Sequence, residues 1–138
     1  METIGRFSRE TVLNDILLVS GFQGRFDFLY MPVDLAARSN IGYAFINFTS
    51  ALAVIDFYEK FHEHVWENST KTCQVSFGRL QGMEALINQF KKRASEAQIP
   101  EKYMPLCFLD GQLVSLSMYG MESLNSGRTV RTVLPAHN

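Results

Sequence analysis

The sequence predicts an α+β domain in which helices pack on an antiparallel sheet, and three patterns support this. Residues 40–48 alternate with period two, as expected for a strand that is apolar on both faces. Residues 8–19 and 51–62 each repeat apolar side chains at helical spacing, behind a hydroxyl residue that can cap the helix. Residues 106–116 place Asp110 and Gly111 between two apolar runs, which is typical of a β-hairpin.

Composition restricts the class of protein. The chain has 138 residues and is 46% hydrophobic, the size of one compact domain with additions. Its 13 basic and 14 acidic residues leave a net charge of −1, so there is no global attraction to nucleic acid. The two cysteines are far apart in sequence, which argues against a disulfide framework and favours a reducing compartment. Because no apolar run approaches membrane-spanning length and no signal-peptide core is present, we expect an intracellular protein of the nucleus or cytoplasm, without membrane contact.

The first half of the chain gives a helix and two strands. Ser8 is a candidate N-cap for a helix that runs to about Val19. Residues 26–31 are rich in aromatic side chains and end at Pro32, which favours a strand. In the strand 40–48, Tyr43 and Phe45 lie on the face opposite the core, where they either form an exposed stacking platform or are covered by another element.

The second half adds two helices, a strand and a hairpin. The helix 51–62 has so wide an apolar arc that extensive burial is expected. Residues 72–77 alternate, so Cys73 and Val75 should point inward and Gln74 should lie on the open face. A third helix is predicted over residues 82–95, ahead of the hairpin. Residues 123–138 are rich in small and polar side chains and are predicted to be a disordered tail.

The order of these elements corresponds to the β-α-β-β-α-β plan of a ferredoxin-like domain with a truncated first strand, followed by a C-terminal helix and hairpin. We therefore divide the chain into a domain over residues 1–98, a hairpin extension that packs on it over residues 99–122, and the tail.

Residues 41–48 resemble the RNP1 octamer of the RNA recognition motif, K/R-G-F/Y-G/A-F-V-x-F/Y. Five positions match outright and Ile46 stands for valine, whereas Ile41 replaces the basic residue. The matching residues are Gly42, Tyr43, Ala44, Phe45 and Phe48. Together with residues 26–34 and 79–82, this octamer resembles the C-terminal RNA recognition motif of the Mei-two-like meiosis regulators, over roughly residues 4–110. The resemblance implies binding of single-stranded RNA on the open sheet face and a role in post-transcriptional or meiosis-type RNA regulation.

The resemblance also implies which residues contact RNA. Tyr43 and Phe45 would stack on bases. Phe26, Leu29 and Met31 would take core positions around a slight irregularity in their strand, so that Phe28 and Tyr30 extend the aromatic platform. The alternative is that a C-terminal element packs over some of these rings, which are then buried and do not stack on bases. The expected polar contacts are Asn47, Gln74, Arg38 and Arg79.

One departure from the family opens a second interpretation. The central RNP2 strand, which precedes the first helix in the family, is reduced here to a few residues, and a sheet without its centre would leave backbone groups unpaired. We expect a strand of the hairpin, over 106–109 or 113–116, or a second chain, to fill or cap the gap. The alternative function is a degenerate RNA recognition motif that serves as a protein-interaction or oligomerisation module, with its aromatic face or its open strand edge receiving a peptide or another subunit.

The sequence contains no motif typical of an enzyme, whether GxSxG, Walker loop, HExxH or a paired Cys-His arrangement. We therefore expect no catalytic residue, no cofactor and no metal site. His62 and His64 have a spacing that can bind metal on a strand, but a pair of histidines at a helix end explains them better.

Overall fold

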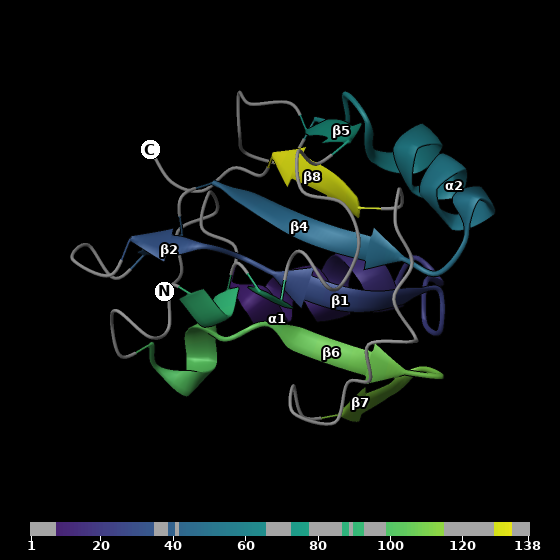
Figure 1. Ribbon diagram of the computed structural model, residues 1–138. Coiled ribbons are helices and arrows are strands. Elements are labelled where there is room, and N and C mark those ends of the chain that lie inside the picture. Colours follow the sequence, from purple (N-terminus) through teal and green to yellow (C-terminus); the bar gives the residue numbers. More distant parts are fainter. Residues whose placement is uncertain are drawn as a thin grey trace.

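The computed structural model describes residues 8–34, 39–40, 42–65, 73–77, 87–88, 90–92, 99–114 and 129–133. Its centre is a six-stranded antiparallel sheet in the order β5-β8-β4-β1-β6-β7 (Figure 1). The strands are β1 (Phe26–Tyr30), β4 (Tyr43–Phe48), β5 (Gln74–Phe77), β6 (Leu106–Leu109), β7 (Gln112–Val114) and β8 (Thr129–Val133). A separate pair consists of β2 (Val33–Asp34) and β3 (Ser39–Asn40). The predicted α+β, ferredoxin-like class is confirmed.

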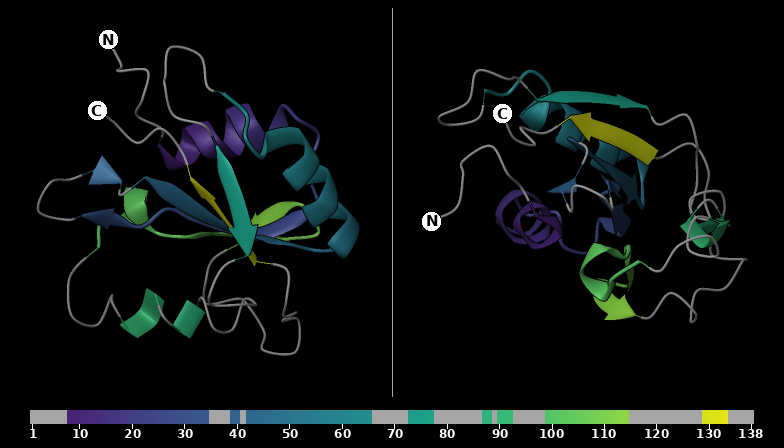
Figure 2. Two further views of the ribbon diagram at one scale, coloured as in Figure 1. Left: turned by 90° about the horizontal axis from the view of Figure 1, so that it is seen from above. Right: turned by 90° about the vertical axis from the view of Figure 1, so that its left-hand side faces the viewer.

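The helices of the first half lie on one face of the sheet (Figure 2). The first begins as α1 (Arg9–Thr11) and continues as the π-helix η1 (Val12–Leu18). Ser8 caps it as predicted, because its Oγ accepts a hydrogen bond from the Thr11 N–H at 3.1 Å. The second helix, α2 (Ala51–Phe61), is capped in the same way by Ser50, whose Oγ accepts from the Ala53 N–H at 3.1 Å.

Burial on α2 is narrower than the apolar arc of its sequence predicts. Ala53, Phe57 and Phe61 are buried against the sheet, whereas Leu52 and Ile55 are 63% and 51% exposed. Extensive burial of the whole arc is therefore a wrong prediction. A helix that packs on a sheet buries only the strip of its surface that contacts the sheet. The apolar side chains of α2 extend around the helix beyond that strip.

A β-bulge in β1 sets which side chains face the helices. The register with β4 shifts between Phe26, which pairs with Phe48, and Phe28, which pairs with Asn47. Because the extra residue advances the alternation by one, Phe26 and Leu29 both face the core. The irregularity predicted for this strand is confirmed, and Met31 joins the same core.

The Asp-Gly hairpin also forms as predicted. β6 and β7 pair in antiparallel register, and the turn residues Asp110 and Gly111 have φ angles of 53° and 80°. Positive φ at both central positions is what a type I′ turn requires, and aspartate and glycine accommodate it with little strain. On its other side, β6 pairs with β1, so the hairpin extends the sheet beyond the edge at β1.

The strand β8 corrects two expectations at once. It lies between β5 and β4 and is antiparallel to both, so residues 129–133 fill the position between these two strands. Neither the hairpin nor a second chain fills this position, and the prediction of a disordered tail is wrong for these five residues. The physical reason is that the unpaired backbone of β4 and β5 gains a complete hydrogen-bonded ladder on both sides of β8.

Thr132 offers a direct test of this placement. Its side chain is 2% exposed on the core face, and its Oγ1 finds no hydrogen-bond partner in the described part of the chain. A buried hydroxyl without a partner destabilises a fold. We therefore expect Thr132→Val to raise the free energy of unfolding by about 1 kcal/mol, measured by urea denaturation.

The matched control is Ser76→Ala, which removes an exposed hydroxyl from the neighbouring strand β5 and should change stability by less than about 0.5 kcal/mol. A Thr132→Val variant no more stable than the wild type would contradict the burial of β8.

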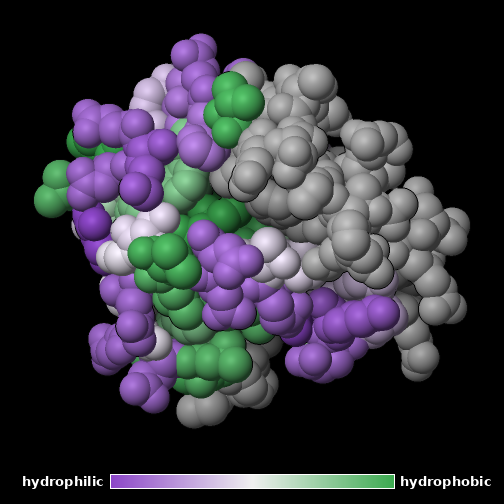
Figure 3. All heavy atoms as spheres, turned by 180° about the vertical axis from the view of Figure 1, so that it is seen from behind, coloured by the Kyte–Doolittle hydropathy of each residue, from purple (hydrophilic) through white to green (hydrophobic). Residues whose placement is uncertain are grey.

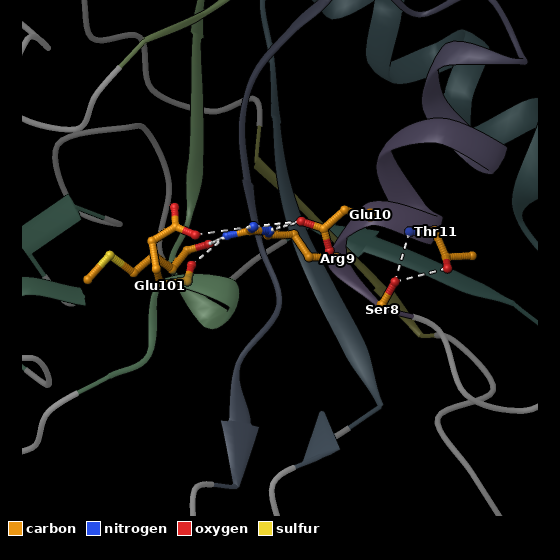
Figure 4. Close-up of polar contacts among 6 residues, drawn as sticks. Ser8, Arg9, Glu10, Thr11 and Glu101 are labelled. Atoms are coloured by element: carbon orange, nitrogen blue, oxygen red, sulfur yellow. Dashed lines mark hydrogen bonds and ion pairs between the residues drawn. The ribbon is translucent and has the colours of Figure 1, made fainter. Parts of the chain in front are cut away.

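Arg9 fixes the segment ahead of β6 to the first helix (Figure 4). Its Nη1 donates hydrogen bonds to the carbonyl oxygens of Glu101 and Met104 at 2.9 and 2.8 Å, and its Nη2 forms an ion pair with Glu10 at 2.6 Å. These carbonyls lie in and after the short 3-10 helix η2 (Glu101–Tyr103). The contact joins elements more than 90 residues apart in sequence.

Within the described ranges, no helix is both long and apolar enough to cross a membrane.

Candidate nucleic-acid interface

The two faces of the sheet carry separate apolar clusters. The larger one lies between the sheet and the helices η1 and α2 and includes Leu29, Ala44, Ile46 and Phe48. The smaller one lies on the opposite face, which is the face that the RNP1 resemblance assigns to RNA. Side chains directly opposite each other in an antiparallel pair lie on the same face of the sheet. The pairing of β4, β8 and β5 therefore shows on which face each of their residues lies.

The half of this face over β1 and β6 is covered. Phe28 is fully buried and Tyr30 is 6% exposed, in a cluster with Ile87, Phe90 and Cys107. The rings of Tyr30 and Phe90 meet edge to face, with their centroids 5.7 Å apart. The helical residues 87–88 and 90–92 belong to the predicted third helix, and Figure 2 shows them on the side of the sheet away from α2.

Phe28 and Tyr30 therefore do not extend an open platform, and this prediction is wrong. The structure agrees with the alternative, in which a C-terminal element covers some of the rings, here Phe28 and Tyr30. Its cause is hydrophobic: two large rings on an otherwise open sheet gain more from contact with Ile87 and Phe90 than from contact with water.

Asn47 is corrected in the same way. Its side chain is fully buried, and its Nδ2 donates a hydrogen bond to Oδ1 of Asp27 at 2.9 Å. Asp27 is the extra residue of the β1 bulge. The amide of Asn47 thus holds the bulge in place and does not face the surface, where RNA could reach it.

The half of the face over β4, β8 and β5 remains accessible. Tyr43 and Phe45 are half-buried, and their rings meet edge to face at a centroid distance of 5.4 Å. Phe45 also packs against the smaller apolar cluster, and this packing fixes the orientation of its ring. Gln74 and Ser76 are exposed on β5, two strands away. Rings held in a fixed orientation with part of their surface in water suit the stacking of unpaired bases.

Arg131 belongs to this surface although the sequence reasoning did not identify it. Its Cα pairs with that of Phe45 on one side and with that of Ser76 on the other. Its side chain is exposed, and its guanidinium carbon lies 5.1 Å from the centroid of the Tyr43 ring. The enrichment of residues 129–133 in β-branched side chains is the signal that could have revealed this strand, although not its place in the sheet.

Arg38 and Arg79 lie outside the residues that the structure describes, as does Ile41 of the octamer. Their roles remain predictions from the sequence.

The accessible surface of the candidate interface is defined by five residues, and we call it the aromatic half-face. These residues are Tyr43, Phe45, Gln74, Ser76 and Arg131.

The two thiols are buried, one in each apolar cluster. Burial raises the pKa of Cys73 from 9.0 to about 12. Burial also raises the pKa of Cys107 to about 12, and the negative charge of Asp27 adds to the shift. Neither thiol is then ionised near neutral pH, so neither acts as a nucleophile.

These raised pKa values predict a loss of stability at high pH. Above pH 9 the unfolded chain releases the thiol protons while the folded chain keeps them, so the unfolded state binds fewer protons and the free energy of unfolding falls with rising pH. The decline should extend from about pH 9 to about pH 12. We expect it to be shallower in the double variant Cys73→Ala/Cys107→Ala, when urea denaturation is followed across this range. Equal slopes in both proteins would contradict the burial of the thiols.

His62 is engaged with neighbouring protein groups. His62 Nδ1 accepts a hydrogen bond from the Val75 N–H at 3.1 Å, and the His62 ring stacks on Tyr58 at 4.4 Å. Across the described ranges, no group of three or more His, Cys, Asp or Glu side chains is placed to hold a metal ion.

Comparison with known proteins agrees with this geometry. The family model described as RNA recognition motif 2 matches residues 4–91, more than half of the chain. The chain is 41% identical over 95 residues to a protein terminal ear1 homolog of Oryza sativa subsp. indica and 40% identical over 100 residues to protein terminal ear1 of Zea mays. These alignments cover 65% and 69% of the chain. It is also 44% identical over 71 residues, half of its length, to protein MEI2-like 5 of Arabidopsis thaliana.

The aligned segments make up only 14%, 15% and 9% of those three relatives. The resemblance to the Mei-two-like regulators is nevertheless confirmed at the level of the domain. The chain therefore belongs to the RNA recognition motif 2 family, whose members are RNA-binding domains.

Proposed function

We propose that the chain binds single-stranded RNA through the aromatic half-face. The observation that carries this proposal is the placement of Tyr43 and Phe45: both are outward residues of the RNP1 strand, and both keep part of their rings in water. Exposed polar side chains flank them on β5 and β8. Gln74 offers hydrogen bonds to base edges, and the two rings offer stacking surfaces to any base.

The covered half of the sheet limits how much RNA the site holds. With Phe28 and Tyr30 beneath Ile87 and Phe90, Tyr43 and Phe45 are the rings of the predicted platform that remain for stacking, each worth about 1 to 3 kcal/mol per base. A net charge of −1 adds no long-range attraction. We therefore expect a short footprint, modest affinity and a preference set mainly by stacking.

The test is a fluorescence anisotropy titration of the protein into a labelled pool of short single-stranded RNAs at low salt, with RNA duplexes of the same composition as the control. We expect the single strands to bind more tightly, because duplex bases are stacked on one another and cannot reach Tyr43 and Phe45. Absence of binding to single strands, or equal binding of duplexes, would contradict the proposal.

The proposed biological role is non-enzymatic post-transcriptional control of RNA, of the meiosis type, inside the cell in the nucleus or the cytoplasm. It is supported by the similarity to MEI2-like proteins and by the RNA recognition motif itself. Ultraviolet crosslinking in cells that express a tagged chain, followed by sequencing of the bound RNA, would identify the targets. RNA recovery no greater than from cells that express the untagged chain would contradict this role.

The exposed apolar side chains of α2 favour a second function, as a protein-interaction module. Leu52 and Ile55 lie in water on the helix-bearing face, where Figure 3 shows apolar side chains among polar ones. Exposed apolar surface of this kind is typical of contacts with other proteins. Sedimentation that shows a rising mass with concentration in the wild type, and none in Leu52→Glu, would support this function.

A further inference from the structure

We infer that Arg131 is an RNA-contacting residue and that β8 is therefore part of the binding site as well as of the sheet. The inference rests on the proposed function and deepens it, because it names the residue that supplies positive charge to the aromatic half-face. The ligand group that it would take is a phosphate of the single strand, with a base stacked beside it.

The position of Arg131 in the sheet carries the first step. It is the middle residue of β8, and its Cα partners are Phe45 on β4 and Ser76 on β5. Its side chain therefore leaves the sheet at the centre of the accessible surface, on the same face as the two rings. The side chains of Val130 and Thr132, on either side, point to the core face and are buried.

The direction of the side chain carries the second step. Although Arg131 pairs with Phe45, its guanidinium carbon lies 5.1 Å from the centroid of the Tyr43 ring, two residues closer to the start of β4. Tyr43 is thus on the N-terminal side of Phe45 in the octamer, whose first position in the sequence carries isoleucine where the RNP1 pattern has a basic residue. Arg131 thus brings a positive charge to Tyr43, which in the sequence is two positions after the octamer position that lacks a basic residue.

The chemistry of the guanidinium carries the third step. A planar cation held against a tyrosine ring keeps donors free at its edge for phosphate oxygens, and its outer plane is a stacking surface for a base. Other described arginines are engaged with protein groups. Arg25 pairs with Asp56 at 2.6 Å, and Arg9 is bonded to Glu10 and to two backbone carbonyls. In a chain of net charge −1, one exposed arginine beside the rings has a large effect on the local potential.

A consequence concerns the extent of the functional unit. The family model ends at residue 91, whereas Arg131 comes from residues 129–133. A protein cut to the matched segment would lose Arg131 and the strand β8 together. RNA binding by this chain therefore depends on residues beyond the family segment.

The experiment compares Arg131→Ala and Arg131→Lys with the wild type, using the single-stranded RNA pool at several salt concentrations. The control is Lys60→Ala, which removes an equal charge from α2 on the other face. We expect Arg131→Ala to weaken binding about five- to tenfold at low salt and to flatten the slope of log affinity against log salt by about 0.7, the value for one phosphate contact on a single strand. Arg131→Lys should keep the salt slope and lose about two- to threefold in affinity. Lys60→Ala should bind like the wild type.

The outcomes separate this inference from the proposed function. If the wild type binds and Arg131→Ala binds equally well with the same salt slope, the inference is wrong while the proposed function stands. If Arg131→Ala binds more tightly, Arg131 blocks the Tyr43 ring, and the inference is again overturned. If the wild type itself does not bind, the proposed function fails and the inference fails with it. Because the side chain is exposed, all three variants should keep the circular dichroism spectrum and melting temperature of the wild type.

Discussion

Replacing Tyr43 and Phe45 together by alanine is expected to remove most of the affinity for single-stranded RNA. Each ring offers one stacking surface worth about 1 to 3 kcal/mol, so the double variant should bind at least about 30-fold more weakly. The effect should hold for every RNA in the pool, since stacking does not distinguish bases strongly. The measurement is the anisotropy titration already described, carried out at one low salt concentration.

Two further variants keep this prediction falsifiable. Tyr43→Leu/Phe45→Leu retains apolar volume beside the smaller cluster while removing both ring faces, so it should lose affinity without losing the fold. Leu52→Ala/Ile55→Ala removes exposed apolar surface from α2 on the opposite face and should leave RNA binding unchanged. Wild-type affinity in the leucine variant would show that the rings do not stack on bases.

The second large effect concerns stability. Phe57 is fully buried at the centre of an aromatic cluster, with ring centroids 5.5 Å from Phe22, 5.1 Å from Phe48 and 4.9 Å from Phe61. Removing a large buried ring loses its transfer free energy and leaves a cavity. We expect Phe57→Ala to lower the free energy of unfolding by about 3 to 5 kcal/mol, a large fraction of the total for a domain of this size.

Leu52→Ala is the matched control, because it lies on the same helix but is mostly exposed. It should change stability by less than about 0.5 kcal/mol. Guanidinium denaturation of both variants, with the same slope m, measures the difference. If Phe57→Ala lowers the free energy of unfolding by less than about 1 kcal/mol, α2 does not pack on the sheet through this ring.

Local patterns were sufficient to predict much of the fold. Ser8 and Ser50 cap their helices because hydroxyl groups at these positions satisfy free backbone donors, a property of a few neighbouring residues. The alternation in β4 placed Ala44, Ile46 and Phe48 in the core, and Asp110-Gly111 formed its turn. Each of these features depends on residues close together in sequence.

Features that depend on distant residues were not predictable in this way. The stretch 129–133 is a short β-branched run within a polar region, and it becomes a strand because β4 and β5 present backbone groups on both sides of it. The rings of Phe28 and Tyr30 are covered by Ile87 and Phe90, about 60 residues later. The alternation of β1 shows that these rings share a face, but it does not show what packs on that face.

The measurement that tests the central claim most directly is a titration of isotopically labelled protein with short single-stranded RNA, followed by backbone and side-chain NMR signals. We expect the largest shifts at Tyr43, Phe45, Gln74, Ser76 and Arg131, on neighbouring strands of one sheet face, and none at Leu52 and Ile55 on α2. Shifts concentrated on α2, with the signals of β4 and β8 unmoved, would contradict RNA binding by the aromatic half-face.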